Sequence, residues 1–210
     1  MTVRVTAGTA RGRQLFVPKT DLRPTTDKIK QAIFSMLEAE ALRRGYEGSE
    51  DSFAACLAWP TVLDLYSGSG SLGIEALSRG AAQVTFIERD RAAAQTIERN
   101  LDKTELRERG TVRRASVEAG LAALSGTYDL ILLDPPYKET AAALRTLMLI
   151  TTHELLADRG LIVWEHQAAK VALALPEGLR SVRRRDHGVT SVTILERELS
   201  EQLGEHDRSD

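Results

Sequence analysis

The stretch Asp129–Tyr137 reads Asp-Leu-Ile-Leu-Leu-Asp-Pro-Pro-Tyr. Leu130–Leu133 is a continuous apolar run followed directly by turn-forming residues, a pattern typical of a strand buried on both faces of a parallel sheet. Asp134 stands where this strand should end, and two prolines fix the backbone as it leaves the sheet. Because open α/β sheets bind ligands beyond the carboxyl ends of their strands, we expect Asp134 and Tyr137 at a ligand site.

The chemistry of this short motif suits a particular kind of ligand. An ionised carboxylate only accepts hydrogen bonds, and an aromatic ring offers a stacking surface. A planar group that carries N–H donors fits both, and a nucleobase with an exocyclic amine is such a group. The same four residues also fit a plain loop with a helix-capping Asp and an exposed Tyr, so the motif by itself leaves both interpretations open.

A glycine-rich turn lies upstream, where Val62–Gly73 reads Val-Leu-Asp-Leu-Tyr-Ser-Gly-Ser-Gly-Ser-Leu-Gly. Gly68, Gly70 and Gly73 follow a predicted strand and open a predicted helix. Glu88 comes twenty residues after Gly68. This spacing matches the dinucleotide-binding fingerprint, in which an acid at the end of the next strand holds a ribose.

Two acids near this turn change the expected ligand. Asp64 lies in the strand that enters the turn, where its charge would oppose a pyrophosphate and would suit a positive amino group. Glu88 can accept hydrogen bonds from both hydroxyls of a ribose. The arrangement favours S-adenosylmethionine, which carries an ammonium, a sulfonium and a ribose, over NAD or flavin. Glycines required only by a tight strand-to-helix turn are the structural alternative.

Strands and helices alternate regularly from residue 61 onward. We predict strands at 61–66, 83–88, 111–114, 128–133 and 161–165, and helices at 71–79, 91–101, 117–124 and 140–156. This order indicates a doubly wound, mostly parallel sheet, and the segments 180–185 and 190–196 predict an antiparallel hairpin at one edge.

The segments before this alternation predict a smaller unit. Residues 3–7 and 14–17 predict a small hairpin, and Thr25 or Thr26 is expected to cap a helix. We expect residues 45–60 to form an exposed loop. The predicted organisation is a basic hairpin extension at 1–25, a main domain at 26–198 and an acidic, frayed tail at 199–210.

Charge is divided unevenly along the chain. The formal net charge is −2, yet residues 1–30 carry +5 and the remainder carries −7. Such asymmetry indicates a basic segment for a polyanion on an otherwise acidic body. The cations expected to contact RNA phosphates are Arg4, Arg11, Arg13, Arg23 and Lys28.

Composition also excludes several classes. No run of eighteen apolar residues and no signal-peptide pattern is present, so we expect a cytoplasmic protein with no membrane partner. The single cysteine, Cys56, excludes an intrachain disulfide and a Cys-cluster metal site, and the four histidines lack ligand spacing. We expect no metal and a monomer.

The two motifs together resemble the class I S-adenosylmethionine-dependent methyltransferases of the Asp-Pro-Pro-Tyr type. The phrases Arg11-Gly12-Arg13 and Arg23-Pro24-Thr25-Thr26-Asp27 make the sequence similar, more narrowly, to the RsmD family, which methylates a guanine N2 in bacterial 16S ribosomal RNA. The resemblance implies a Rossmann-like fold with a seven-stranded sheet, and small-subunit ribosomal RNA as partner, free or within an assembling particle.

The resemblance also implies roles for the motif residues. The flipped base would be received by Asp134, Pro135, Pro136 and Tyr137. The cofactor would be bound by Asp64, Tyr66, Ser67, Gly68, Ser69, Gly70, Glu88, Arg89, Ser116, Val117 and Asp134. The alternatives are an amino-methyltransferase acting on adenine N6 or cytosine N4 of RNA or DNA, a dinucleotide-dependent oxidoreductase, and a catalytically silent RNA-binding protein.

Overall fold

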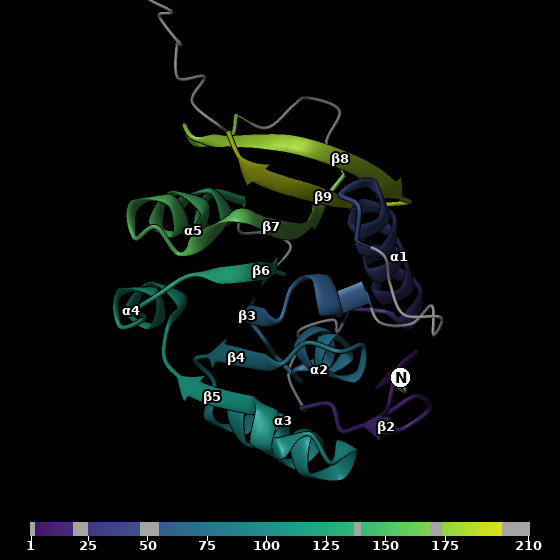
Figure 1. Cartoon of the computed structure of the whole chain (residues 1–210). Helices are drawn as coiled ribbons and strands as arrows, with labels where there is room; N and C mark the ends of the chain where they lie inside the picture. The colour runs from purple at the N-terminus through teal and green to yellow at the C-terminus, as the bar shows by residue number, and fades with distance from the viewer. Residues whose placement is uncertain (1–2, 19–24, 47–54, 137–139, 169–173, 199–210) are drawn as a thin grey trace, which may run out of the picture.

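Seven strands form one sheet in the order β5-β4-β3-β6-β7-β9-β8 in the computed structural model, which describes residues 3–18, 25–46, 55–136, 140–168 and 174–198 (Figure 1). The strands are β3 (Thr61–Leu65), β4 (Gln83–Glu88), β5 (Gly110–Arg114), β6 (Tyr128–Leu133), β7 (Leu156–Gln167), β8 (Leu179–His187) and β9 (Thr190–Arg197). The first five are parallel, and β9 pairs antiparallel with β7 and β8. The predicted doubly wound sheet with an antiparallel edge is confirmed.

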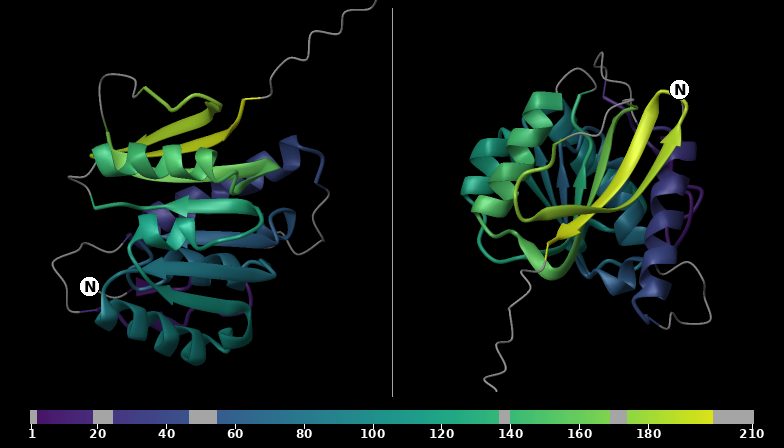
Figure 2. Two further views of the ribbon diagram at one scale, coloured as in Figure 1. Left: turned by 90° about the vertical axis from the view of Figure 1, so that its left-hand side faces the viewer. Right: turned by 90° about the horizontal axis from the view of Figure 1, so that it is seen from above.

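Helices cover both faces of this sheet. They are α1 (Asp27–Arg43), α2 (Ser71–Ser78), α3 (Arg91–Thr104), α4 (Val117–Ala122) and α5 (Thr140–Thr152). Figure 2 shows α1 and α5 on opposite sides of the strands. None of the helices in the described part of the chain is long and apolar enough to cross a bilayer.

Strand β6 shows why two layers form. Its side chains alternate, so Leu130 and Leu132 join the core under α1, α2 and α3, whereas Ile131 and Leu133 join the core under α4 and α5. All four are buried, since successive residues of a strand point to opposite faces and both faces are covered. The apolar run after Asp129 therefore fixes the central strand, with the predicted bounds 128–133.

The N-terminal segment forms a smaller hairpin than predicted. Strands β1 (Val3–Arg4) and β2 (Gln14–Leu15) hold two residues each, because the chain between them turns toward α2. Gly8 adopts a φ of +80°, and a Cβ there would lie 1.8 Å from the Ser78 carbonyl oxygen. The expected strand at 3–7 therefore gives way to a close backbone contact that only glycine allows.

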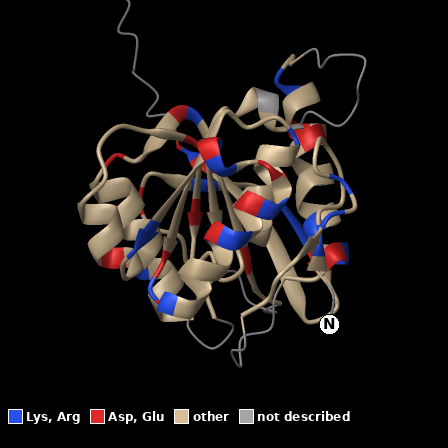
Figure 3. Ribbon diagram, turned by 90° about the horizontal axis from the view of Figure 1, so that it is seen from below, with Lys and Arg blue, Asp and Glu red and all other residues tan. Residues whose placement is uncertain are grey.

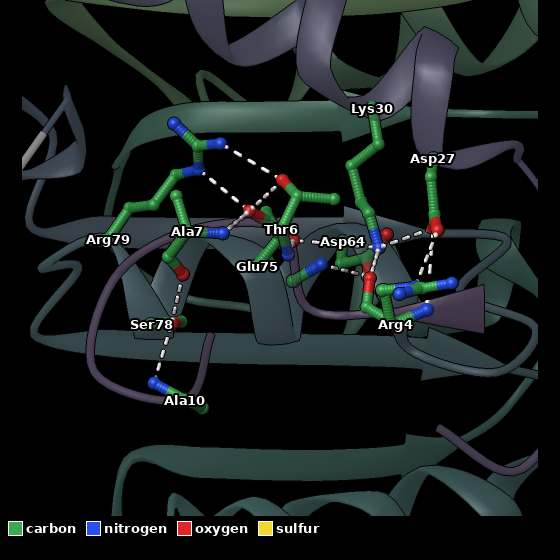
Figure 4. A network of polar contacts seen from close by, with 11 residues as sticks. Arg4, Thr6, Ala7, Ala10, Asp27, Lys30, Asp64, Glu75, Ser78 and Arg79 are labelled. Atoms are coloured by element: carbon green, nitrogen blue, oxygen red, sulfur yellow. Dashed lines mark hydrogen bonds and ion pairs between the residues drawn. The ribbon is translucent and has the colours of Figure 1, made fainter. Parts of the chain in front are cut away.

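Glu75 of α2 binds this turn from inside the protein. Its carboxylate accepts hydrogen bonds from the Thr6 amide (2.8 Å), the Thr6 hydroxyl (2.6 Å) and the Ala7 amide (3.0 Å) (Figure 4). Arg79 donates to the same carboxylate at 2.8 Å, and the Lys30 ammonium lies 3.5 Å from it. Thr6 and Ala7 of the predicted hairpin are therefore fixed to the body of the protein.

Lys30 links this carboxylate to α1. Its side chain is fully buried, and its ammonium donates to the Arg4 carbonyl oxygen at 2.6 Å. Burial lowers the pKa of Lys30, and the nearby charges of Glu75 and Asp27 act in the opposite direction. A buried cation is tolerable only with such partners, so the hairpin, α1 and α2 depend on one another.

The prediction of an exposed loop at 45–60 is wrong for the final part of that segment. The 3-10 helix η1 (Ala55–Ala58) follows residues 47–54, which lie outside the described residues, as does the predicted tail at 199–210. Cys56 is fully buried and Trp59 is 3% exposed. Both belong to the core beside α1 and α2, because the short apolar patch packs inward.

We predict that Glu75→Ala lowers the free energy of unfolding by about 3–5 kcal/mol, because it removes the buried carboxylate that Lys30 and Arg79 share. Urea denaturation measures this loss. Glu98→Ala is the matched control, since Glu98 is half exposed, forms a 3.6 Å pair with Arg107, and should cost less than about 1 kcal/mol. Equal stability of the two variants would contradict the prediction.

Candidate active site

A pocket of about 530 Å³ lies beyond the carboxyl ends of β3, β4, β5 and β6. This volume is within the range of small-molecule sites. Its lining comes from the loops after these strands, the start of α2, the start of α4 and one side of α5. The lining residues are Thr25, Asp64, Tyr66, Ser67, Gly68, Ser69, Ser71, Leu72, Ile87, Glu88, Arg89, Ala115, Ser116, Val117, Glu118, Asp134, Pro135, Pro136, Ala142 and Arg145.

The pocket gathers nearly all the residues that the sequence singled out. Asp134, Pro135 and Pro136 lie in it, together with every predicted cofactor residue except one. The exception is Gly70, which precedes the first residue of α2 and packs toward Ile97 in the core. Tyr137 falls outside the described residues.

Asp64 lies at the inner wall of the pocket, on β3. It is 2% exposed, and its Oδ2 accepts a hydrogen bond from the Gly73 amide at 2.9 Å. A Cβ on Gly73 would lie 2.4 Å from Phe86, so glycine allows α2 to come this close. Burial raises the pKa of Asp64 to about 8, and the charges of Asp134 and Glu88 add to the rise. A positively charged ligand beside Asp64 would favour the ionised carboxylate and so oppose this rise in pKa.

Glu88 ends β4 and holds the glycine turn. Its two oxygens accept hydrogen bonds from the Gly68 amide and the Asp90 amide, each at 2.8 Å. A carboxylate has about four lone-pair positions, so two remain for hydroxyl donors of a ligand. The acid that sequence reasoning assigned to a ribose therefore also orients the turn.

Ser71, at the first position of α2, adds an unsatisfied group. Its hydroxyl oxygen is buried, lines the pocket, and has no hydrogen-bond partner among the described residues. Buried polar groups normally have partners, and an exception in a pocket indicates a place where a ligand atom binds. Together with Asp64, this hydroxyl offers both an acceptor and a donor beside the glycine turn.

Asp134 follows β6 directly and is partly buried. Its Oδ2 accepts a hydrogen bond from the Thr25 hydroxyl at 2.5 Å. Burial raises the pKa of Asp134 to about 6, while the hydrogen bond from Thr25 acts to lower it. In its ionised form this carboxyl can accept further hydrogen bonds on Oδ1.

Thr25 and Arg145 are pocket residues that the sequence did not reveal. Thr25 was expected only as a possible helix cap, but Thr26 performs that role by accepting from the Ile29 amide at 3.3 Å. The Thr25–Asp134 contact joins residues 109 positions apart. Arg145 reaches the pocket from α5. No local pattern signals either contact, because both arise from the packing of distant elements.

The predicted RNA-binding cations differ in their surroundings. Arg13 donates to the Lys103 carbonyl oxygen at 2.6 Å and pairs with Glu105 at 2.8 Å, and Arg4 pairs with Asp27 at 3.6 Å. Arg11 and Lys28 are exposed, and neither forms an ion pair within the described ranges. In the view from below, Figure 3 shows several basic residues (blue) close to acidic ones (red). Arg23 lies outside the described residues.

Comparisons with a family model and with curated proteins match nearly the whole chain. A family described as "Conserved hypothetical protein 95" matches residues 3–196. The Bacillus subtilis protein YlbH is 38% identical over 199 residues, which span 91% of this chain and 97% of that protein. "Ribosomal RNA small subunit methyltransferase D" of Escherichia coli is 31% identical over 199 residues, spanning 93% and 90% of the two chains.

Solved structures agree with these relatives. The structure of the Escherichia coli protein yhhF has a TM-score of 0.77 and 30% sequence identity, and it covers 94% of this chain and 99% of that one. A Thermus protein, TTHA0928, has a TM-score of 0.71 and 28% identity over 92% of this chain. The fold described above is therefore that of a class I methyltransferase.

We predict that the contribution of Asp64 to the stability of the ligand-free protein falls as the pH rises from about 4 to about 8. A raised pKa means that the folded state holds the Asp64 proton more tightly than the unfolded chain does, so this contribution is complete at low pH and is lost as the pH rises toward the folded value. Asp64→Asn should reduce the slope in urea titrations at several pH values. Asp158→Asn, at an exposed position, should retain it. Parallel slopes for wild type and Asp64→Asn would contradict the prediction.

Proposed function

The chain belongs to the RsmD family of ribosomal RNA methyltransferases, and we propose that it transfers a methyl group from S-adenosylmethionine to the exocyclic N2 amine of a guanine in small-subunit ribosomal RNA. The observation that carries this proposal is the shared pocket. It places Asp134, Pro135 and Pro136 beside a glycine turn that is flanked by two further acids, Asp64 and Glu88.

The residues present fit S-adenosylmethionine. Three carboxyl groups meet in one pocket, and the pKa values of Asp64 and Asp134 are raised, so a cationic ligand gains more there than an anionic one. The unpartnered Ser71 hydroxyl and the remaining lone pairs of Glu88 supply polar contacts. We propose that Asp64 and Ser71 face the amino acid part and that Glu88 binds the ribose. The cofactor supplies an activated methyl group on its sulfonium.

The Asp-Pro-Pro segment would prepare the amine. A guanine N2 is a poor nucleophile, because its lone pair is delocalised into the ring. When the Asp134 carboxylate and the Pro135 carbonyl oxygen each accept an amine hydrogen, the nitrogen becomes more pyramidal and its lone pair points out of the ring plane. Orientation of this kind can contribute about 7–11 kcal/mol at best. The proton that leaves the amine passes to Asp134 or to water.

The base must leave its stack before it can reach this pocket. Unstacking costs a few kcal/mol, and stacking on one aromatic ring returns about 1–3 kcal/mol. We expect Tyr137 to provide that ring, in keeping with its place in the sequence immediately after Pro136. Exposed cations of the N-terminal segment would hold the flanking phosphates.

The rival functions differ in what the pocket must accept. A dinucleotide would bring a pyrophosphate next to Asp64 and Glu88, which the charges disfavour. Adenine and cytosine amines would fit the same acceptors as guanine. To identify the methylated base, unmethylated small-subunit particles and free 16S RNA are each incubated with the protein and labelled S-adenosylmethionine. Mass analysis of the nucleosides then gives the result. N2-methylguanosine supports the proposal, and methylated adenosine or cytidine contradicts it.

We predict that Asp134→Ala lowers the rate of methyl transfer by about 10²–10³, because one preorganised polar contact to the reacting amine is lost. Calorimetry should show cofactor affinity within a few-fold of wild type. Asp158→Ala, at an exposed position, should leave both quantities unchanged. Turnover of Asp134→Ala close to that of wild type would remove Asp134 from the reaction.

We predict that Arg11→Gln combined with Lys28→Gln weakens RNA binding and lowers its salt dependence. The slope of log K against log salt should fall by about 0.7–0.9 for each phosphate contact removed. The control is Arg183→Gln with Arg185→Gln, on β8 at the other edge of the sheet. If the Arg11→Gln, Lys28→Gln variant keeps the wild-type slope, these two cations do not form the RNA contact.

A further inference from the structure

The hydroxyl of Thr25 makes a contact that the helix cap does not require. Thr25 immediately precedes Thr26, and Thr26 alone caps α1. Thr25 is 9% exposed, lies in the pocket wall, and donates to the Asp134 Oδ2 at 2.5 Å. This buried hydroxyl binds the acid proposed to act in the reaction and does not cap its own helix, so local helix structure does not account for the contact.

The physical effect of this bond falls on Asp134. The terminal torsion of an Asp side chain is soft, so a carboxylate without a partner can turn its plane freely. A donor fixed to Oδ2 sets that plane and leaves Oδ1 for another hydrogen. The bond also stabilises the charged form, because hydrogen bonds to an ionised acceptor are stronger than those to a neutral one. A protonated carboxyl would instead carry a hydrogen of its own toward the amine.

We propose that Thr25 is a positioning residue for methyl transfer: its hydroxyl holds the Asp134 carboxylate in the orientation and the ionised state from which it accepts a hydrogen of the target amine. This inference rests on the proposed function, since it assigns a supporting contact to the acid placed in the reaction. It assigns no contact between Thr25 and the base.

Other charged groups also line this pocket, namely Asp64, Glu88, Glu118, Arg89 and Arg145. The causes that shift the pKa of Asp134 are its burial, which raises the pKa, and the hydrogen bond from Thr25, which lowers it. Among the described residues, the Thr25 hydroxyl donates a hydrogen bond to Asp134. Its removal therefore shifts the ionisation of this acid while every other charge stays in place.

Thr25 belongs to a segment that is bound to the N-terminal part of the chain. It stands directly before α1, whose first turn is bound to the N-terminal segment through the Arg4 amide, which donates to Asp27 at 3.3 Å, and through the Lys30 ammonium. The donor to Asp134 is thus carried by a segment held at two points, so the hydroxyl has little freedom to leave the carboxylate.

The test compares Thr25→Val, which keeps the shape of the side chain without its hydroxyl, with Thr25→Ser, which keeps the hydroxyl. We expect Thr25→Val to lower kcat at least tenfold with little change in the KM for RNA, and to move the acidic limb of its pH profile upward by about one unit. Thr25→Ser should resemble wild type in both. Thr26→Val controls for structure, because it weakens the cap of α1 without moving the acidic limb.

A wild-type kcat and acidic limb in Thr25→Val would overturn the proposal, and so would a Thr25→Ser variant as impaired as Thr25→Val. If Thr25→Val does not fold, NMR titration of the Asp134 carboxyl carbon in Thr25→Ala gives a readout that is independent of turnover, and an unchanged midpoint overturns the proposal. Failure of the proposed function is separate: Asp134→Ala would then retain activity, whatever Thr25 does.

Discussion

The buried carboxylate of Glu75 is the constraint on which the rest of the structure depends. It lies on α2, the helix that begins at the glycine turn, and it is satisfied by two backbone amides, a hydroxyl and two cations from the N-terminal segment, α1 and α2 itself. A buried charge has to be paired or hydrogen-bonded, so these three segments are held together around the Glu75 carboxylate. The positions of the turn and of α1 relative to the sheet follow from this requirement.

Asn100 of α3 provides a second link between the N-terminal segment and the pocket. It is fully buried, and its amide nitrogen donates to the carbonyl oxygens of Phe16 and Ser69, each at 2.9 Å, while its oxygen accepts from the Phe16 amide at 2.7 Å. One side chain therefore joins the residues after β2 to the glycine turn. A nucleic acid that docks on the N-terminal segment would meet a surface already fixed relative to the cofactor site, with no ordering of a flexible arm required.

The sequence predicted those parts of the fold and site that depend on local pattern. The apolar run at Leu130–Leu133 gave strand β6 with its bounds, and the acids at strand ends came together because parallel strands end at the same edge of a sheet. The remainder depends on tertiary packing. Three features depend on segments that are distant along the chain. They are the burial of Cys56 and Trp59, the short β1, and the contact of Thr25 with Asp134. Neither periodicity nor spacing carries that information.

The charges in the pocket give a physical reason why the cofactor and the RNA phosphates would bind at separate places on the protein. Asp64, Glu88 and Asp134 share one small volume, and burial opposes the ionisation of Asp64 and Asp134. Such a site favours a cationic ligand over a phosphate, so we propose that the RNA backbone is held outside it. The exposed cations Arg11 and Lys28 of the N-terminal segment would supply that separate place. On this proposal the acidic pocket and the basic segment meet complementary requirements of a reaction between a cationic donor and a polyanionic acceptor.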